Sequence, residues 1–183
     1  FSIFIAIIGY VSAAEQLRKN LGLTEEEFLN VMKETMERLK GNNATLIDLD
    51  ADPCIPSGWS VKKKGQLPNR VRGKLVWDST KVGLHFSENQ QNNKGVEGHR
   101  LRRELKNQTV LSANVLDYLL AHPELIPEEW KDKAVFFWGT IYHSADGHLC
   151  VRYLYFDDGR WFWNYGELDC GWDSDHPALV FVS

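Results

Sequence analysis

The sequence predicts an α+β fold, in which N-terminal helices precede a C-terminal antiparallel sheet. Two observations lead to this prediction. Up to residue 121 apolar residues recur at helical spacing in several stretches, whereas from residue 134 onward they follow the strand period and turn sequences separate the runs. The chain has 183 residues, enough for one domain with a small helical annex. We therefore expect residues 1–41 to be a helical segment that docks on an α+β ligand-binding domain, residues 42–183.

The N-terminal stretch FSIFIAIIGYVSA is similar to the apolar region of a signal peptide, but it has no basic leader and is too short to span a bilayer. We expect it to form a buried first strand or helix, and a cytoplasmic or a cell-surface location both stay open. No membrane span is expected.

Two capping-box patterns, Ser12–Glu15 and Thr24–Glu27, predict the starts of two helices. The second helix is expected over about 25–40, with an apolar stripe that belongs to the core. The stripe consists of Phe28, Leu29, Met32, Met36 and Leu39.

Basic side chains outnumber acidic ones over residues 61–106, which we call the basic belt, although the whole chain has a net charge of −4. A short strand is expected before it, over 45–52, and a helix within it, over 97–106, with Leu101 and Leu105 facing inward. Nucleic-acid association through Lys62, Lys63, Lys64, Arg100, Arg102 and Arg103 is one possible function. Because this stretch has no aromatic stacking platform and no DNA-reading motif, nucleic acid is not the expected partner.

The second half of the chain begins with a helix, expected over 110–121, and continues with strands. A hairpin is predicted from 134–142 and 149–156, and Asp157–Gly159 forms a second turn. The stretch 164–176 is expected to be a loop, and 177–182 a last apolar strand.

Aromatic and acidic residues crowd into the C-terminal part of the chain. Five of the seven tryptophans follow residue 129, and acidic residues stand among them. Carboxylates are not buried without partners, so some of these rings must face water. Rigid aromatic rings beside short polar residues are typical of a recognition surface.

The same region also contains residues of two kinds of enzyme site. His143, His148, Cys150, Cys170 and His176 lie close in sequence, but their spacing lacks the paired short intervals of a zinc site. Glu167, Asp169 and Asp173 supply carboxylates of the kind that glycosidases use, without a spacing that defines such a pair. A metal-dependent or glycoside hydrolase is therefore the alternative function, and no catalytic residue, metal or cofactor is expected. A disulfide between Cys150 and Cys170 stays open.

Two stretches carry a resemblance to a known family. Residues 112–130, SANVLDYLLAHPELIPEEW, resemble proteins of candidate-phylum bacteria or archaea, and the likeness extends from about Asp50 onward. The ending, with GRWFWNY at 159–165, resembles the variable region of target proteins of diversity-generating retroelements. In that family a reverse transcriptase mutates adenines, so that Asn codons diversify while Trp codons persist. The resemblance implies a C-type lectin-like fold, and a ligand-binding protein whose partner is a protein.

The resemblance also implies which residues vary and which support them. Glu167 departs from the pattern, because mutated adenines in an Asn codon do not give Glu. Trp161, Trp163 and Trp172 are expected to form the scaffold of the site, with Tyr165, Asp169, Asp173 and Asp175 on one exposed face above Trp161 or Trp163. The positions expected to vary, within the variable region 156–176, are Phe156, Phe162, Asn164, Tyr165, Gly166, Asp169, Cys170, Gly171, Asp173, Ser174, Asp175 and His176.

Overall fold

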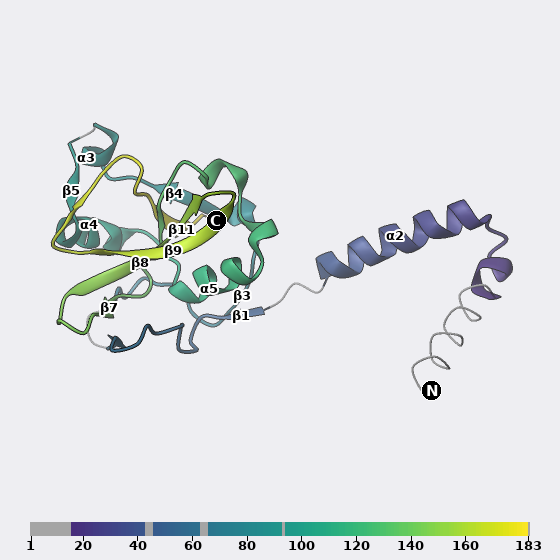
Figure 1. Ribbon diagram of the computed structural model, residues 1–183, viewed down its shortest axis with the longest axis horizontal. Helices are drawn as coiled ribbons and strands as arrows, with labels where there is room; N and C mark the ends of the chain where they lie inside the picture. The colour runs from purple at the N-terminus through teal and green to yellow at the C-terminus, as the bar shows by residue number, and fades with distance from the viewer. Residues whose placement is uncertain (1–15, 43–45, 63–65, 93, 183) are drawn as a thin grey trace. The chain divides into compact units, whose positions relative to one another are not determined.

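The computed structural model describes residues 16–42, 46–62, 66–92 and 94–182 (Figure 1). The chain divides into two compact units, Phe1–Ala44 and Thr45–Ser183. The apolar segment 1–13 and the capping box at Ser12–Glu15 lie outside the described residues. Within the described residues, no helix is long and apolar enough to cross a membrane.

The first unit contains helix α2, Glu25–Asn42, which begins where the capping box predicts. The Thr24 hydroxyl donates to Glu27 Oε2 at 2.7 Å, and the Glu27 amide donates to Thr24 Oγ1 at 3.3 Å. Phe28 is buried, but Leu29 is 60% exposed and Met32 39% exposed. The expected core stripe is therefore not formed at these two positions.

The second unit is built around one mixed sheet with helices packed against it, which confirms an α+β fold. Its strands follow the order β2-β7-β8-β6-β11-β4, and β9 pairs with β8. All pairs are antiparallel except β11 with β6, which are parallel at Ala178 and Phe136, so the prediction of a purely antiparallel sheet is wrong there. The bounds are β2 Ser60–Val61, β4 Val82–His85, β6 Val135–Phe136, β7 Tyr142–His143, β8 Leu149–Asp157, β9 Arg160–Glu167 and β11 Ala178–Phe181.

Shorter elements complete this unit. Two further pairs of strands, β1 with β3 and β5 with β10, lie outside the main sheet. Their bounds are β1 Leu46–Asp48, β3 Lys74–Val76, β5 Val96–Glu97 and β10 Gly171–Trp172. The helices are α3 Glu88–Gln91, α4 Gly98–Glu104 and α5 Ala113–Ala121, with 3-10 turns at Ser79–Lys81, Leu105–Asn107, Pro123–Leu125 and Glu128–Trp130.

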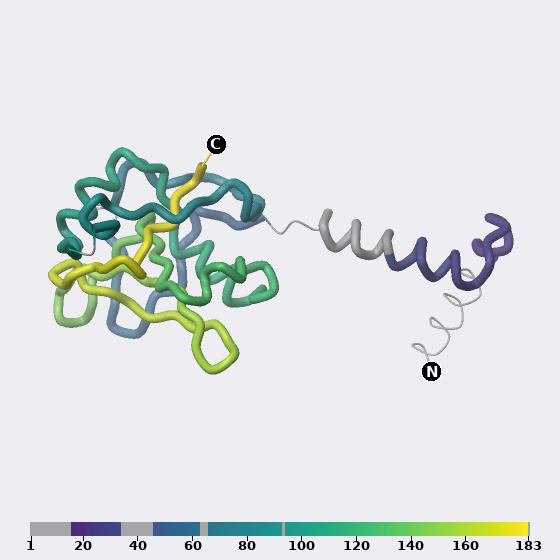
Figure 2. Tube along the Cα trace, turned by 90° about the horizontal axis from the view of Figure 1, so that it is seen from above, coloured from purple at the N-terminus to yellow at the C-terminus, as the bar shows by residue number. Residues whose placement is uncertain are grey.

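The longest pair of strands is the hairpin of β8 and β9, which run side by side along their length (Figures 1 and 2). Asp158 and Gly159 form its two-residue loop with φ of 44° and 79°, as a type I′ turn requires. This turn confirms the predicted one. Strand β9 continues to Glu167, however, because Cys150 to Tyr153 of β8 supply pairing partners. The predicted loop therefore begins at Leu168 and not at Asn164.

The strand predicted over 134–142 is interrupted between β6 and β7. At the interruption the Gly139 amide donates to the Leu111 carbonyl at 2.8 Å. A Cβ at Gly139 would lie 2.6 Å from the carbonyl carbon of Leu111, so only glycine permits this approach. Helix α5 also begins later than predicted, because Val110 is in extended conformation and bridges to Val180.

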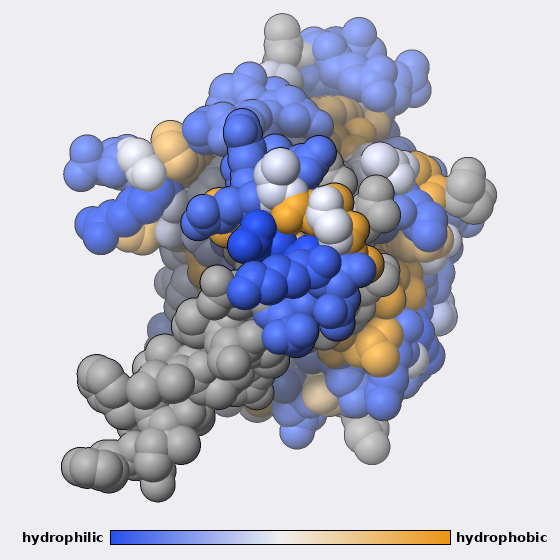
Figure 3. Space-filling view, turned by 90° about the vertical axis from the view of Figure 1, so that its right-hand side faces the viewer, coloured by the Kyte–Doolittle hydropathy of each residue, from blue (hydrophilic) through white to orange (hydrophobic). Residues whose placement is uncertain are grey.

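Two apolar clusters cover the two faces of the sheet. Side chains of α5, including Val115 and Leu119, pack with Leu154 on one face. On the other face Leu101 and Leu105, both fully buried as predicted, pack with Trp138, Trp172 and Phe136. Among the coloured residues in the view of Figure 3, hydrophilic ones predominate and hydrophobic ones appear in small groups between them. Because Trp172 belongs to the second cluster, the C-terminal loop closes over the face of the sheet opposite α5.

Candidate binding surface

Every position expected to vary is exposed or half-buried in the structure. Asn164, Tyr165, Asp169, Cys170, Gly171, Asp173, Ser174 and Asp175 are exposed, and Phe156, Phe162, Gly166 and His176 are half-buried. Between them Leu168 and Trp172 are buried, at 0% and 1% exposure. The positions expected to vary and the core residues therefore alternate within one short segment.

Successive side chains of β9 point to opposite faces of the sheet. Asn164 and Gly166 pair with Tyr153 and Val151 of β8 and lie on the side of Trp172. A Cβ at Gly166 would lie 3.1 Å from Trp172 Cζ2, which shows how closely this side is packed.

An open pocket of about 450 Å³ lies on the Trp172 side. Its lining includes Phe136, Tyr153, Asn164, Cys170, Trp172 and His176. The rings of Phe136 and Trp172 are tilted against each other with centroids 3.9 Å apart, and they form its apolar floor. Polar groups of the C-terminal loop border it, and an apolar floor with a few polar groups is typical of a binding pocket.

The other side of β9 carries Trp161, Trp163 and Tyr165. The Trp163 ring lies over the guanidinium of Arg152, 4.1 Å from Cζ to the ring centroid. Tyr165 contacts Trp59 edge to face with centroids 4.8 Å apart. Trp163 and Tyr165 are 37% and 42% exposed, so this side is a second, aromatic part of the surface.

This division corrects the expectation of one common face. The Tyr165 ring packs against Trp59 on the side of the strand opposite Asn164 and Gly166, although Tyr165 also contributes to the lining of the pocket. The ring beneath the loop is Trp172, and Trp161 packs instead with the cluster formed by α5. The physical reason is that β9 continues through these residues and sends neighbouring side chains to opposite sides.

A buried cation supports the aromatic side. Arg152 in β8 is 1% exposed, and its Nη1 donates to Asp117 Oδ1 of α5 at 2.8 Å and to the Cys54 carbonyl at 3.2 Å. Asp117 Oδ2 accepts from the Cys54 amide at 2.8 Å, and the Tyr142 hydroxyl donates to the Cys54 carbonyl at 3.1 Å. Burial raises the pKa of Tyr142 to about 12, so the phenol stays neutral. This network fixes β8, α5 and the chain at Cys54 to one another.

Hydrogen bonds also hold the C-terminal loop in place. Nε2 of the fully buried Gln90 donates to the carbonyls of Asp173 and His176, both at 2.9 Å. The Gly98 amide donates to the Cys170 carbonyl at 3.2 Å. A Cβ at Gly98 would lie 2.7 Å from Trp172 Nε1, so glycine allows α4 to pack directly against the loop. The polar side chains are thus presented on a fixed backbone.

The histidines and carboxylates of the hydrolase alternative are only partly brought together. Asp169 Oδ1 lies 3.1 Å from His99 Nε2, and Asp169 Oδ2 lies 3.5 Å from His148 Nδ1. Glu167 Oε2 lies 3.9 Å from the same His148 nitrogen. Among the described residues no group of three or more such side chains is arranged to hold a metal ion.

The described side chains of the basic belt are spread over more than one surface. Arg102, Arg103 and Lys106 border a small pocket together with His99 and Leu67, and Arg100 Nε donates to Glu104 Oε1 at 3.0 Å. Lys63 and Lys64 lie outside the described residues. Part of the positive charge is thus paired within α4 itself.

Several residues of the surface were not predicted from the sequence. Trp59, Gln90, Phe136 and Tyr153 come from distant segments and join the site only through the sheet. Arg152 is the one charged residue in the apolar run CVRYLYF, residues 150–156. A lone charge in a buried strand indicates a residue that needs a buried partner, and this was the only signal in the sequence for its role.

Comparison of the chain with known protein families, with curated proteins and with solved structures found no match.

The buried ion pair gives the first prediction. Asp117→Ala leaves the Arg152 charge without its carboxylate, and we expect the free energy of unfolding to fall by about 3 kcal/mol, as for other broken buried pairs. Arg152→Met added to Asp117→Ala should recover part of this loss. Urea unfolding of both single variants and the double variant measures the coupling. If the effects of the two single substitutions add within about 0.5 kcal/mol, the two side chains do not interact. The control is Glu104→Ala, which breaks the more exposed ion pair between Arg100 and Glu104. It should change the free energy of unfolding by less than about 1 kcal/mol.

The cysteines give the second prediction. All three are free thiols, with Cys150 buried and Cys54 and Cys170 exposed. Burial, followed by the charge of Glu167, raises the pKa of Cys150 to about 11. Iodoacetamide at pH 8 should therefore modify Cys54 and Cys170 in the folded protein, and Cys150 only after denaturation, as intact-mass spectrometry can show. Modification of Cys54 alone would instead indicate a Cys150–Cys170 disulfide.

Proposed function

We propose that residues 156–176 form the ligand-binding surface of a variable protein of the diversity-generating retroelement type, on a C-type lectin-like fold. The observation that carries this proposal is the burial pattern. None of the positions expected to vary is buried, while Leu168 and Trp172 between them belong to the core. Substitutions at the exposed positions change the surface and leave the packing intact. In this proposal the protein binds and does not catalyse, and it needs no cofactor.

The fixed backbone of the loop supports a binding role. A surface that is ordered before it meets its ligand loses little conformational entropy on binding. Gln90 and Gly98 hold the loop from two different segments, so a changed side chain meets the ligand in the same place. The pocket above Phe136 and Trp172 supplies an apolar centre, and Asn164, Glu167 and His176, which also line it, supply polar groups around that centre.

The position of β9 supports a protein as the partner. Among the described strands β9 pairs with β8 alone, so its outer edge is uncovered. In a two-residue hairpin the residues of non-hydrogen-bonded pairs direct their amide and carbonyl groups outward, and in the open part of β9 these are Trp161, Trp163 and Tyr165. The edge ends at Glu167, whose carbonyl accepts from the Cys170 amide at 3.0 Å. The Tyr165 amide is capped by Asn164 Oδ1 at 2.8 Å. An open edge flanked by aromatic rings suits an extended segment of another protein.

Sequencing the gene and its surroundings in a natural population tests the proposal. Amino-acid replacements should be concentrated at the twelve positions expected to vary between Phe156 and His176, with Trp161, Trp163 and Trp172 unchanged. Replacement of Gly166 by residues with large side chains should be rare, because Phe136 and Trp172 lie close to it. A reverse transcriptase gene and a near-copy of the variable segment should lie beside the gene. Replacements spread evenly over the chain, or the lack of both neighbours, would refute the proposal.

A further inference from the structure

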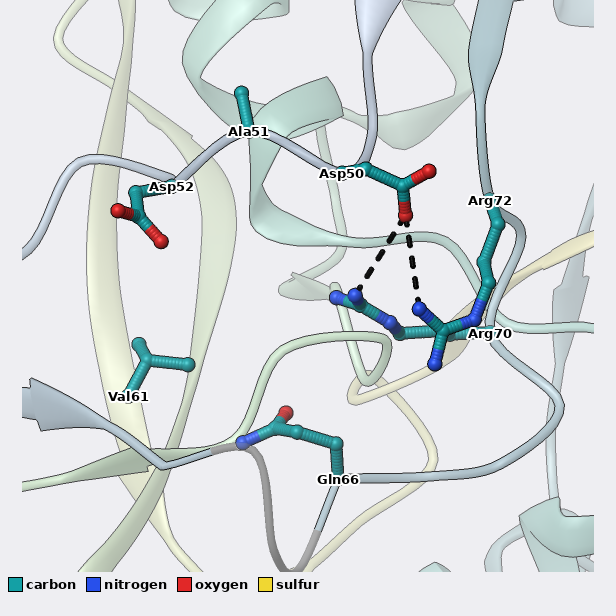
Figure 4. A pocket seen from close by; sticks show the side chains of 7 residues that line it. All are labelled: Asp50, Ala51, Asp52, Val61, Gln66, Arg70 and Arg72. Atoms are coloured by element: carbon teal, nitrogen blue, oxygen red, sulfur yellow. Dashed lines mark ion pairs between the residues drawn. The ribbon is translucent and has the colours of Figure 1, made fainter.

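A second pocket, of about 410 Å³, is lined entirely by residues outside 156–176. It lies between the chain that follows β1, the end of β2 and the extended segment before β3 (Figure 4). Its lining consists of Asp50, Ala51, Asp52, Val61, Gln66, Arg70 and Arg72. The surface proposed above uses none of these side chains.

Two arginines reach this pocket because their segment is extended. Arg70 bridges to Val110, and the Val71 amide donates to the Val110 carbonyl at 3.0 Å. Val71 packs on the apolar cluster of α5, so the residues on either side of it project the opposite way. Figure 4 shows the guanidinium groups of Arg70 and Arg72 next to each other below Asp50.

The guanidinium groups have more donors than the protein uses. Arg70 Nη2 and Arg72 Nη1 lie 3.8 and 3.6 Å from one atom, Asp50 Oδ1, beyond ordinary hydrogen-bond distance. The other oxygen, Asp50 Oδ2, accepts from the Gly73 amide at 2.9 Å. Arg70 Nε is buried and has no hydrogen-bond partner among the described residues. Burial and the charge of Arg72 lower the pKa of Arg70, which Asp50 only partly offsets.

The rest of the pocket limits what anion fits. Asp52 has no ion pair within the described part of the chain, and its carboxylate points toward the space between Val61 and the arginines (Figure 4). Both polar atoms of the Gln66 side chain are hydrogen-bonded to the backbone, because Nε2 donates to the Ile141 carbonyl and Oε1 accepts from the Ile141 amide, both at 2.7 Å. Gln66 therefore forms part of the pocket wall. A carboxylate across the pocket disfavours a multiply charged anion and favours a ligand with a cationic group on that side.

We propose that this pocket binds a small zwitterion of the amino-acid type. Its carboxylate lies on the guanidinium groups of Arg70 and Arg72, which match a carboxylate with paired N–H donors. Its ammonium group faces Asp52, and a short aliphatic side chain lies against Val61.

Amide chemical shifts of the ¹⁵N-labelled protein test this pocket, with L-alanine, propionate and inorganic phosphate as probes. We expect saturable shifts at Ala51, Val61 and Gly73 with alanine, and at least about tenfold weaker binding of propionate, which lacks the ammonium group. Arg72→Gln should abolish the alanine shifts, and Asp52→Asn should remove the preference for alanine over propionate. Both side chains lie at the surface, and the dispersion of each spectrum shows whether the variant is folded. Arg103→Gln, which removes an exposed arginine that does not line this pocket, should leave binding unchanged.

Three results would overturn the proposal. They are the absence of saturable shifts with alanine, alanine binding that survives Arg72→Gln, and phosphate binding as tight as that of alanine. The last result would assign the pocket to simple anions. Since none of these residues belongs to 156–176, the outcome is independent of the proposed variable surface.

Discussion

The contact between Arg152 and Asp117 is the constraint on which the second unit depends. A guanidinium at 1% exposure needs partners for its charge, and Asp117, the Cys54 carbonyl and the Trp163 ring contact it, while its Nε has no hydrogen-bond partner among the described residues. These partners come from a helix, a loop and the neighbouring strand. The ion pair therefore fixes the distance between α5 and β8, and with it the position of β9.

The candidate binding surface is built on this pair of strands, β8 and β9. Strand β9 has one side on Arg152 and the other on the Phe136 and Trp172 rings, so its backbone is held from both sides. The loop after Leu168 is then held by Gln90 and by the close approach of Gly98. The proposed division between supporting and exchangeable residues therefore rests on packing, and it makes no assumption about the ligand.

Local signals in the sequence predicted local structure well. The capping box at Thr24 and the Asp158–Gly159 turn form as expected, because their hydrogen bonds join residues close in sequence. The parallel pairing of β6 with β11 and the approach of Gly139 to Leu111 join segments far apart in the chain, and no local pattern encodes them. The exposed positions of the site were predicted, but their division between two sides of β9 was not, because the strand was expected to end earlier.

The central claim, that a fixed frame carries a freely exchangeable surface, can be measured with two libraries displayed on cells. One randomises Tyr165, Asp169, Asp173, Ser174 and Asp175, and the other randomises Gln90, Arg152, Leu154, Leu168 and Trp172. Protease resistance of each member reports whether it folds. The account predicts that most members of the first library resist cleavage like the parent chain and that most of the second do not. Equal loss of resistance in both libraries would contradict it.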